Sequence, residues 1–179
     1  MTLPAFFFDR DGVVNRDPHP EPYVLSWEQW DWNPGIVELL VAAKSAGLVP
    51  VLVTSQKGVG KGLMTEADLE EIHGNMQTFL RENGVEFAEI YAFTGLPNCL
   101  NQPKPDPQML ERAALELNLD LGRSWLIGDA DRDIEMGRRA GVGHLIRVEG
   151  IKSVGIEAEY QVSTLDAALE IFENRQNGN

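Results

Sequence analysis

Two aspartates, one residue apart, follow the first apolar run of the chain. Three phenylalanines at positions 6–8 precede Asp9, and Asp11 and Gly12 come soon after. The apolar run is typical of a buried strand, and Gly12 allows the tight turn by which the chain leaves it. In an open parallel sheet, ligands bind beyond the carboxyl ends of the strands. We therefore expect Asp9 and Asp11 to project into a functional site.

Such a pair of carboxylates can play one of three roles. In a solvated loop, the pair would leave the apolar run before it unexplained. At the start of an EF-hand calcium loop, it would need ligands at the fifth and twelfth positions, which here are Val13 and Pro20. In covalent catalysis, Asp9 would attack a phosphate ester and Asp11 would carry protons, since a carboxylate can form an aspartyl-phosphate. The residues favour covalent catalysis.

The composition is that of an acidic globular chain. It has 179 residues, with 28 acidic and 15 basic side chains and a net charge of −13. This charge repels nucleic acid and anionic membrane, so we expect neither as a partner. Cys99 is the only cysteine, which excludes an internal disulfide and a cysteine-rich metal site. No apolar segment approaches the ~20 residues of a membrane helix, and the N terminus lacks the basic region of a signal peptide. We expect a cytoplasmic protein, a monomer or weak oligomer, that acts on a small molecule.

Apolar runs alternate with amphipathic segments along the chain. The expected strands are residues 5–8, 48–53, 87–93, 125–127 and 144–148. The expected helices are residues 34–46, 65–82, 106–117, 131–140 and 163–173. This alternation predicts an α/β fold, a single doubly wound domain with a central parallel sheet over residues 1–173. We expect a flexible tail at 174–179, and no insertion is long enough for a large cap domain.

Residue types at the ends of these segments predict where the helices begin and end. Thr65 and Asp106 are the expected N-caps of two helices, and a proline follows Asp106 at the first helical position. Asp131 is expected to cap the fourth helix, and Gly141 to end it. Ser163 begins a Ser-x-x-Asp pattern, close to a capping box, at the start of the last helix.

Residues 16–33 form the longest irregular stretch and contain Trp27, Trp30 and Trp32. Burial of these rings would pin the loop to the body of the protein, and we expect this for at least two of them. Because the segment leaves directly from Asn15, it could also form a wall beside the site.

The second expected strand ends in Thr54, Ser55 and Gln56, and a glycine-rich stretch at 57–62 follows it. A P-loop would need Gly-x-x-x-x-Gly-Lys followed by Ser or Thr, whereas here a glycine follows the lysine and Ser55 stands in place of the first glycine. The stretch is therefore not a P-loop. Thr54, at a strand end with backbone N–H groups after it, is a candidate phosphate ligand.

Two more positions carry charges suited to a phosphate ester. Lys104 stands between two prolines that fix its place, and a fixed ammonium can stabilise charge that develops on a phosphoryl group. Asp129 ends the fourth expected strand, as Asp9 ends the first. Carboxylates from adjacent strand ends, together with water, form the oxygen-rich site that Mg²⁺ prefers.

Taken in order, these motifs resemble the haloacid dehalogenase (HAD) superfamily of phosphohydrolases. The resemblance covers residues 5–172 and rests on Asp9-x-Asp11-Gly-x-x-Asn15, the strand-terminal Thr54, Lys104-Pro and Gly-Asp129-x-x-x-Asp133. The narrower patterns, which look like the subfamily of histidinol-phosphate and heptose-bisphosphate phosphatases, are Asp-Arg-Asp-Gly at 9–12, Thr54-x-Gln56 and Gly-Arg-Arg-Ala-Gly-Val at 137–142. The resemblance implies a Rossmann-like HAD fold.

The resemblance also implies a role for each site residue. Asp9 is the nucleophile and Asp11 the general acid/base. Mg²⁺ is held by Asp9, Asp129 and the carbonyl of Asp11. The residues expected to bind the phosphate and the substrate are Thr54, Ser55, Gln56, Lys104 and Asn15. Asp133 is expected to orient the site as a supporting carboxylate.

The activity implied is Mg²⁺-dependent hydrolysis of a small phosphorylated metabolite through an aspartyl-phosphate. D-glycero-D-manno-heptose 1,7-bisphosphate is the first expectation for the substrate, and histidinol phosphate is the alternative. A polynucleotide substrate is disfavoured by the net charge of −13. An alternative of a different class is a non-catalytic regulatory protein that retains the fold, and the joint presence of the site residues speaks against it.

The substrate-facing part of the chain departs from the subfamily pattern. Ser55 stands where Asn is usual, Pro103 where Arg precedes the lysine, and Gln108 where Gly is usual. Typical members also carry a zinc loop of several Cys and a His before the lysine, whereas residues 94–102 hold only Cys99. Tetrahedral zinc needs about four such ligands. We therefore expect Mg²⁺ and no zinc.

Overall fold

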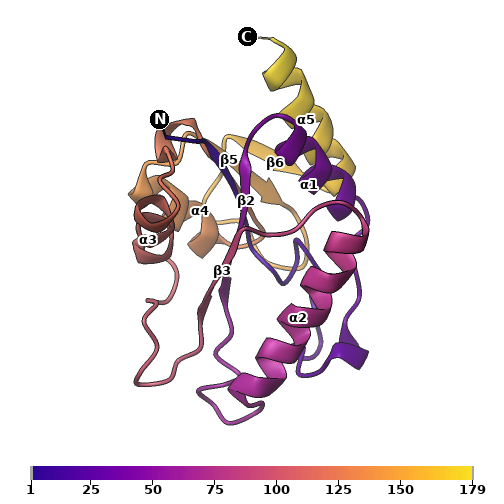
Figure 1. Ribbon diagram of the computed structural model, residues 1–179, viewed down its shortest axis with the longest axis vertical. Coiled ribbons are helices and arrows are strands. Elements are labelled where there is room, and N and C mark those ends of the chain that lie inside the picture. Colours follow the sequence, from indigo (N-terminus) through magenta and orange to yellow (C-terminus); the bar gives the residue numbers. More distant parts are fainter. Residues whose placement is uncertain (1, 179) are drawn as a thin grey trace.

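A parallel sheet forms the centre of the computed structural model, which describes residues 2–178. Its six strands lie in the order β3-β2-β1-β4-β5-β6 (Figure 1). Their bounds are Ala5–Phe8 for β1, Val49–Ser55 for β2, Glu89–Phe93 for β3, Trp125–Gly128 for β4, His144–Val148 for β5 and Tyr160–Val162 for β6. The strand that carries the aspartate motif, β1, lies in the middle and pairs with β2 and β4.

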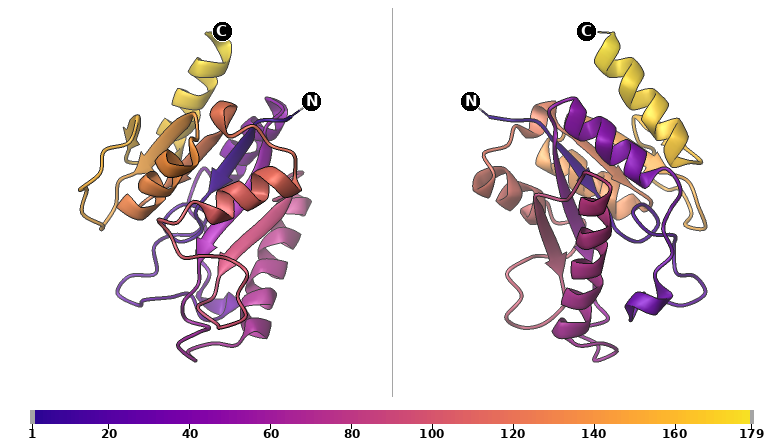
Figure 2. Two further views of the ribbon diagram at one scale, coloured as in Figure 1. Left: turned by 90° about the vertical axis from the view of Figure 1, so that its left-hand side faces the viewer. Right: turned by 45° about the vertical axis from the view of Figure 1, so that its right-hand side comes forward.

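Helices cover both faces of this sheet. They are α1 (Ile36–Ser45), α2 (Glu66–Glu82), α3 (Gln108–Glu116), α4 (Asp131–Ala140) and α5 (Leu165–Asn177). Phe6 and Phe8 of β1 pack in one core with α1, α2 and α5, and Phe7 packs in the other with α3 and α4 (Figure 2). A central parallel strand is buried on both faces, which is why its sequence is a continuous apolar run. The single doubly wound α/β domain predicted from the sequence is confirmed.

Two of the predicted helix ends are confirmed. Thr65 is the N-cap of α2, where its hydroxyl accepts the N–H of Asp68 (3.1 Å) and its own N–H donates to the Asp68 carboxylate (2.7 Å). Gly141 ends α4 in the left-handed region, with φ of 74°. The reciprocal bonds at Thr65 satisfy backbone donors that would otherwise have no partner at the start of the helix.

Two other predicted caps are wrong by one residue. Pro107, not Asp106, is the N-cap of α3, and the Asp106 carboxylate instead accepts the N–H of Gln108 (2.9 Å). Thr164, not Ser163, is the N-cap of α5, and its hydroxyl accepts the N–H of Ala167. At α5, Ser163 and Thr164 have similar side chains that can compete for one cap. At α3, Asp106 still makes the bond that a cap makes, and the helix is bounded one residue later than predicted.

The predicted end of the last helix is also wrong. Helix α5 continues to Asn177, so residues 174–177 are helical and do not belong to a flexible tail. Gln176 and Asn177 lie beside Ala42 and Ser45 of α1, with which they line a shallow surface groove. Residues 173–177 are exposed, so the helix continues beyond its apolar pattern. Strand β6 was not predicted, because three residues are too few to give a pattern.

Asp131 does not cap α4 and serves a different purpose. Its carboxylate accepts hydrogen bonds from the Arg147 guanidinium and from the N–H groups of Gly155 and Ile156. The Arg147 side chain is fully buried, so the ion pair fixes the loop after β5 against the start of α4. This loop lies beside the ends of β1 and β4, so the ion pair that fixes it also borders the site.

The segment between β1 and α1 is pinned by its aromatic rings, as expected. Trp27 stacks on Trp30 with ring centroids 5.3 Å apart, and Trp32 stacks on Phe79 of α2 at 4.4 Å. All three tryptophans are half-buried against the core. None of the helices in the described part of the chain is long and apolar enough to cross a bilayer.

A matched pair of leucines tests how much of the stability comes from the core between α1 and the sheet. Leu39 on α1 is 0% exposed and Leu115 on α3 is 85% exposed. Leu39→Ala is expected to lower the free energy of unfolding by about 2–5 kcal/mol, because it removes buried surface and leaves a cavity. Leu115→Ala should change it by less than about 0.5 kcal/mol. Urea unfolding curves followed by circular dichroism measure both, and equal losses would contradict this description of the core.

Candidate active site

Three strands bring the predicted site residues to one edge of the sheet. Asp9 follows β1, Thr54 lies near the end of β2, and Asp129 follows β4. Phe8 is in register with Leu52 of β2 and Ile127 of β4, so these strands end at nearly the same level. The chain termini lie at the opposite end of the molecule (Figure 1).

A buried lysine lies between two of the carboxylates. The Lys104 ammonium contacts an oxygen of Asp9 at 2.8 Å and an oxygen of Asp133 at 2.7 Å. The Lys104 side chain is fully buried and the two carboxylates are nearly so. The same Asp9 oxygen, Oδ1, also accepts the N–H of Arg10 (2.8 Å). The Asp9 carboxylate is therefore held in one orientation by two donors.

Asp9, Asp129 and Asp133 form a cluster that can hold a metal ion. One oxygen from each carboxylate lies within 4.8 Å of the others. Asp133 is already engaged, because Oδ1 accepts from Lys104 and Oδ2 accepts the N–H groups of Asp129 and Ala130. Oδ1 of Asp129 is buried and has no hydrogen-bond partner among the described residues. Asp9 and Asp129 thus have free ligand capacity, whereas Asp133 supports the backbone around them.

Two glycines make room for this cluster. Gly12 has φ of +89°, and a Cβ atom there would lie 2.0 Å from Oδ2 of Asp129. A Cβ atom on Gly128 would lie 2.3 Å from the Cβ atom of Asp133. The missing side chain of Gly12 lets the turn after β1 approach the end of β4, and that of Gly128 lets the end of β4 approach the first turn of α4.

The second aspartate of the motif is held by three neighbours. The Arg10 guanidinium contacts both Asp11 oxygens at 3.0 and 3.3 Å. The amide of Gln56 donates to Asp11 Oδ2 (2.9 Å) and the amide of Asn15 donates to Oδ1 (3.0 Å). Gln56 also donates to the hydroxyl of Thr54 (2.8 Å), which links Asp11 to the end of β2.

Arg10 is itself fixed by a histidine from α2. Nη1 of Arg10 lies 3.3 Å from Nε2 of His73. A guanidinium can only donate, so this ring nitrogen must be the acceptor. Burial and the nearby Arg10 charge lower the pKa of His73 to about 3, which keeps the imidazole neutral. The guanidinium carbon of Arg10, Cζ, also lies over the Trp30 ring, 5.8 Å from its centroid, so the aromatic segment helps to hold Arg10.

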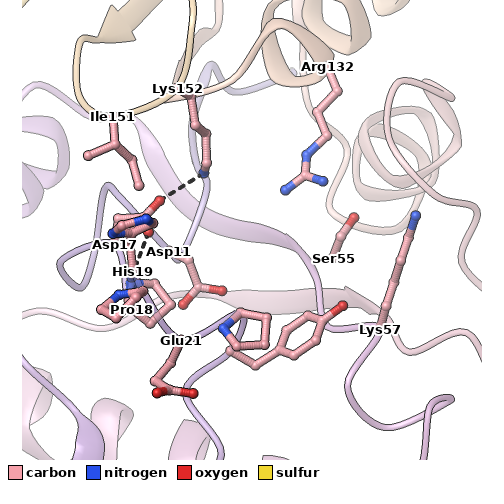
Figure 3. Close-up of a pocket in the computed structure, with 13 residues that line it drawn as sticks. Asp11, Asp17, Pro18, His19, Glu21, Ser55, Lys57, Arg132, Ile151 and Lys152 are labelled. Carbon is pink, nitrogen blue, oxygen red and sulfur yellow. Dashed lines mark hydrogen bonds and ion pairs between the residues drawn. The ribbon is translucent and has the colours of Figure 1, made fainter.

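A cavity of about 290 Å³ opens above Asp11. One wall consists of residues 17–23, so the segment after β1 does border the site. The remaining lining residues are Ser55, Lys57, Arg132, Ile151 and Lys152 (Figure 3). Lys152 reaches back from the loop after β5 to the carboxylates of Asp17 and Asp129. Asp11 and Lys152, which contacts Asp129, therefore place the cavity beside the carboxylate cluster.

Comparison with known proteins identifies the family. The profile of the HAD-hydrolase-like family matches residues 102–164. A D-glycero-β-D-manno-heptose-1,7-bisphosphate 7-phosphatase of Photorhabdus laumondii is 32% identical over 175 residues, which cover 93% of this chain and 92% of that protein. The corresponding α-D-manno enzyme of Burkholderia mallei is 38% identical over 147 residues, 78% of this chain and 76% of that protein. The chain belongs to this family of HAD phosphatases.

Similarity to a solved structure supports the assignment to this family. The D,D-heptose 1,7-bisphosphate phosphatase of B. bronchiseptica, complexed with magnesium and phosphate, aligns with a TM-score of 0.82 at 27% identity. The alignment covers 97% of this chain and 99% of that one. The protein is therefore a phosphoric monoester hydrolase of the HAD superfamily, as the sequence motifs predicted.

The electrostatics of the phosphatase site suit a bound cation. Burial, with the charges of Asp9 and Asp133, raises the pKa of Asp129 to about 7, although Lys152 opposes this. Burial and Asp133 also raise the pKa of Asp9 against the effect of Lys104. These shifts have two causes, of which burial is the larger and repulsion between the neighbouring carboxylates is the second. A divalent cation on their hard oxygens would relieve the repulsion, so the residues present fit Mg²⁺.

Asp11 and Asp133 titrate in the opposite direction. Burial alone would raise the pKa of Asp11, but Arg10, Gln56 and Asn15 outweigh it, and the pKa lies below its ordinary value. Burial is likewise outweighed at Asp133, mainly by Lys104, which lowers its pKa. Both groups are held as carboxylates by donors that surround them.

The structure thus brings most of the predicted site residues together, with a difference in what some of them contact. Asn15 and Gln56 are fully buried and donate to Asp11, and neither is among the residues that line the cavity. Their geometry favours orienting Asp11 over contacting the phosphate that we expected them to bind. Ser55 does line the cavity, and its buried hydroxyl has no partner among the described residues.

Sequence reasoning missed several residues near the site. His73 lies on the buried face of an amphipathic helix, where it could not be told from a core residue. Arg132 and Lys152 follow strands β4 and β5 but lie in no pattern that marks a site. The place of Arg10 between the two aspartates was a signal that it belongs to the site. Its side chain is buried beside Asp11 and fixes that carboxylate.

Removing the side chain of Lys104 tests directly what its buried charge contributes to catalysis. Lys104→Ala is expected to lower kcat by about 10²–10³, since one positioned donor to developing charge is lost. The matched control is Lys61→Ala, an exposed lysine that lies over the Tyr23 ring. Steady-state kinetics with an aryl phosphate measure both, and circular dichroism checks that the variant folds. Wild-type kinetics in Lys104→Ala would make Lys104 a structural ion-pair partner only.

Proposed function

We propose that the phosphatase removes the 7-phosphate from D-glycero-D-manno-heptose 1,7-bisphosphate. The observation that carries the proposal is the site itself, in which Asp9 and Asp129 at the ends of adjacent strands converge with Lys104 from the loop before α3. The names of relatives that match nearly the whole chain support the substrate. One such relative acts on the β anomer and another on the α anomer, so the anomer is left to experiment.

In the proposed reaction, the Asp9 carboxylate attacks the phosphorus atom in line with the leaving oxygen. The bond from phosphorus to the sugar oxygen breaks as the bond to Asp9 forms. Asp11 is a carboxylate in the free site, so the proton that it passes to the sugar oxygen has to arrive with the substrate, whose phosphate carries one as the monoanion. Lys104, 2.8 Å from Asp9, neutralises charge on the phosphoryl oxygens. The Thr54 hydroxyl, near the end of β2, is placed to bind another of these oxygens.

In the second half of the reaction, water hydrolyses the aspartyl-phosphate. Asp11, now deprotonated, takes a proton from the attacking water, which restores Asp9 and releases phosphate. Asn15, Gln56 and Arg10 keep the Asp11 carboxylate in position for both proton transfers. The two carboxylates of the motif therefore have separate tasks set by their separate partners.

The proposed cofactor is Mg²⁺, held by the carboxylates of Asp9 and Asp129 and the carbonyl of Asp11. When bound, it would neutralise part of the negative charge shared by the phosphate and the carboxylates. Asp133 would orient the site through the N–H groups of Asp129 and Ala130. We also infer, from the net charge of −13, that nucleic acid and membrane are not partners, and we propose a cytoplasmic monomer or weak oligomer.

The nucleophile can be tested with an isosteric change. Asp9→Asn keeps the shape of the side chain but removes the attacking charge, so nearly all turnover of the heptose bisphosphate should be lost while the fold is retained. Phosphate release is measured with both anomers, with histidinol phosphate and with an aryl phosphate. Substantial turnover by the variant would exclude covalent catalysis at Asp9. A wild-type preference for histidinol phosphate would overturn the proposed substrate.

The second test concerns zinc. The loop at 94–102 is held by hydrogen bonds, since Cys99 Sγ accepts the N–H of Thr94 (3.5 Å) and Asn101 donates to the carbonyl of Ala92 (2.9 Å). One soft ligand does not hold a tetrahedral zinc ion. Elemental analysis of tag-free protein is expected to find no stoichiometric zinc. About one zinc ion per chain, persisting after mild chelation, would contradict this prediction.

A further inference from the structure

Two cations on one side of the cavity make no salt bridge with any described carboxylate, although the charges of Asp9 and Asp133 outweigh burial and raise the pKa of Arg132. Of the three basic residues that line it, Lys152 is paired with Asp17 and Asp129. Lys57 and Arg132 make no ion pair with any described residue within salt-bridge distance. Both are exposed side chains, so nothing in the packing requires a charge at either position. In a chain with a net charge of −13, two such unpaired cations in one cavity point to an anionic ligand.

These cations come from two different elements and face one space. Lys57 follows the end of β2, with its ammonium 6.0 Å from the Phe93 ring, and Arg132 belongs to the first turn of α4. Figure 3 shows the Arg132 guanidinium and the Lys57 ammonium on the same side of the cavity, with the Ser55 hydroxyl between them. That hydroxyl is buried and unpartnered among the described residues. We call Ser55, Lys57 and Arg132 the cationic wall.

The acidic residues of the cavity lie away from the cationic wall. Asp17 and Glu21 are on the other side of the view in Figure 3, and Asp17 is neutralised by Lys152. Asp11 lies between the two sides, and its carboxylate is satisfied by Arg10, Gln56 and Asn15. The cavity is therefore divided, with free positive charge on one side only.

The proposed reaction already has a cation for the transferred phosphoryl group. Lys104 contacts Asp9, the proposed nucleophile, and does not line the cavity, whereas Lys57 and Arg132 do. We propose that the cationic wall binds the second phosphate of a bisphosphate substrate, the one that is not transferred. A guanidinium, an ammonium and a hydroxyl can donate several charge-assisted hydrogen bonds to one phosphate. This inference rests on the proposed function and assigns its substrate selectivity to residues of this chain.

The experiment compares a bisphosphate with a monophosphate in charge-removing variants. Lys57→Gln and Arg132→Gln should each lower kcat/KM for the heptose bisphosphate about tenfold more than kcat/KM for p-nitrophenyl phosphate. The matched controls are Lys61→Gln, on the same loop as Lys57, and Arg139→Gln, on the same helix as Arg132. Each control removes the same charge outside the cavity and should leave both values near those of the wild type.

Each outcome decides the proposal. Equal losses with both substrates would mean that the cationic wall serves the reacting phosphate, and no loss would mean that it binds neither, so both overturn the inference. If the wild type hydrolyses p-nitrophenyl phosphate but not the heptose bisphosphate, the proposed function fails by itself. The inference is then judged by competition, with fructose 1,6-bisphosphate and fructose 6-phosphate as inhibitors. A preference for the bisphosphate that is lost in both variants supports it, and equal inhibition of the wild type by the two overturns it.

Discussion

The site depends on the repulsion between buried carboxylates and on the lysines that partly offset it, Lys104 between Asp9 and Asp133 and Lys152 at Asp129. Asp9, Asp129 and Asp133 approach within 4.8 Å in a region nearly closed to solvent, where each uncompensated charge is costly. Lys104 contacts two of them and leaves Asp129 with a raised pKa and a free oxygen. The protein alone thus leaves the cluster with excess negative charge. A bound cation, or a substrate that brings its own cation, would neutralise this charge.

The fold is organised to keep these charges in place. The cluster forms because β1 and β4 are neighbours in the sheet, and because Gly12 and Gly128 leave room where a Cβ atom could not fit. Asp133 secures the turn at the end of β4 by accepting two backbone N–H groups. On the outer side of α4, the pair of Asp131 and buried Arg147 fixes the loop that carries Lys152. Each acidic residue in this stretch therefore has a different partner and a different task.

Much of this arrangement could be predicted from the sequence, for physical reasons that also explain the misses. The continuous apolar run of β1 predicted a central strand, and the strand order then had to bring Asp9 and Asp129 together. The cap at Ser163 was misplaced because Thr164 offers similar chemistry, and α3 begins one residue later than predicted although Asp106 makes the bond of a cap. The end of α5 was underestimated because the helix continues through exposed residues, which give no apolar pattern. His73 was missed because a histidine on the buried face of α2 gives the same pattern whether it is structural or fixes Arg10.

Surface cations of the site are harder to predict from the sequence than buried ones. The reason also explains how the substrate selectivity of the phosphatase can change. Lys104 must be buried among carboxylates to serve the chemistry, and such a residue is constrained by its partners on every side. Lys57 and Arg132 lie on a loop and at a helix start, where a side chain can change without disturbing the core. Pro103 supplies no charge beside Lys104, so any additional positive charge for the substrate has to come from such peripheral positions. The catalytic cluster can therefore stay fixed while the opposite ends of different substrates are recognised by residues that the fold leaves free to vary.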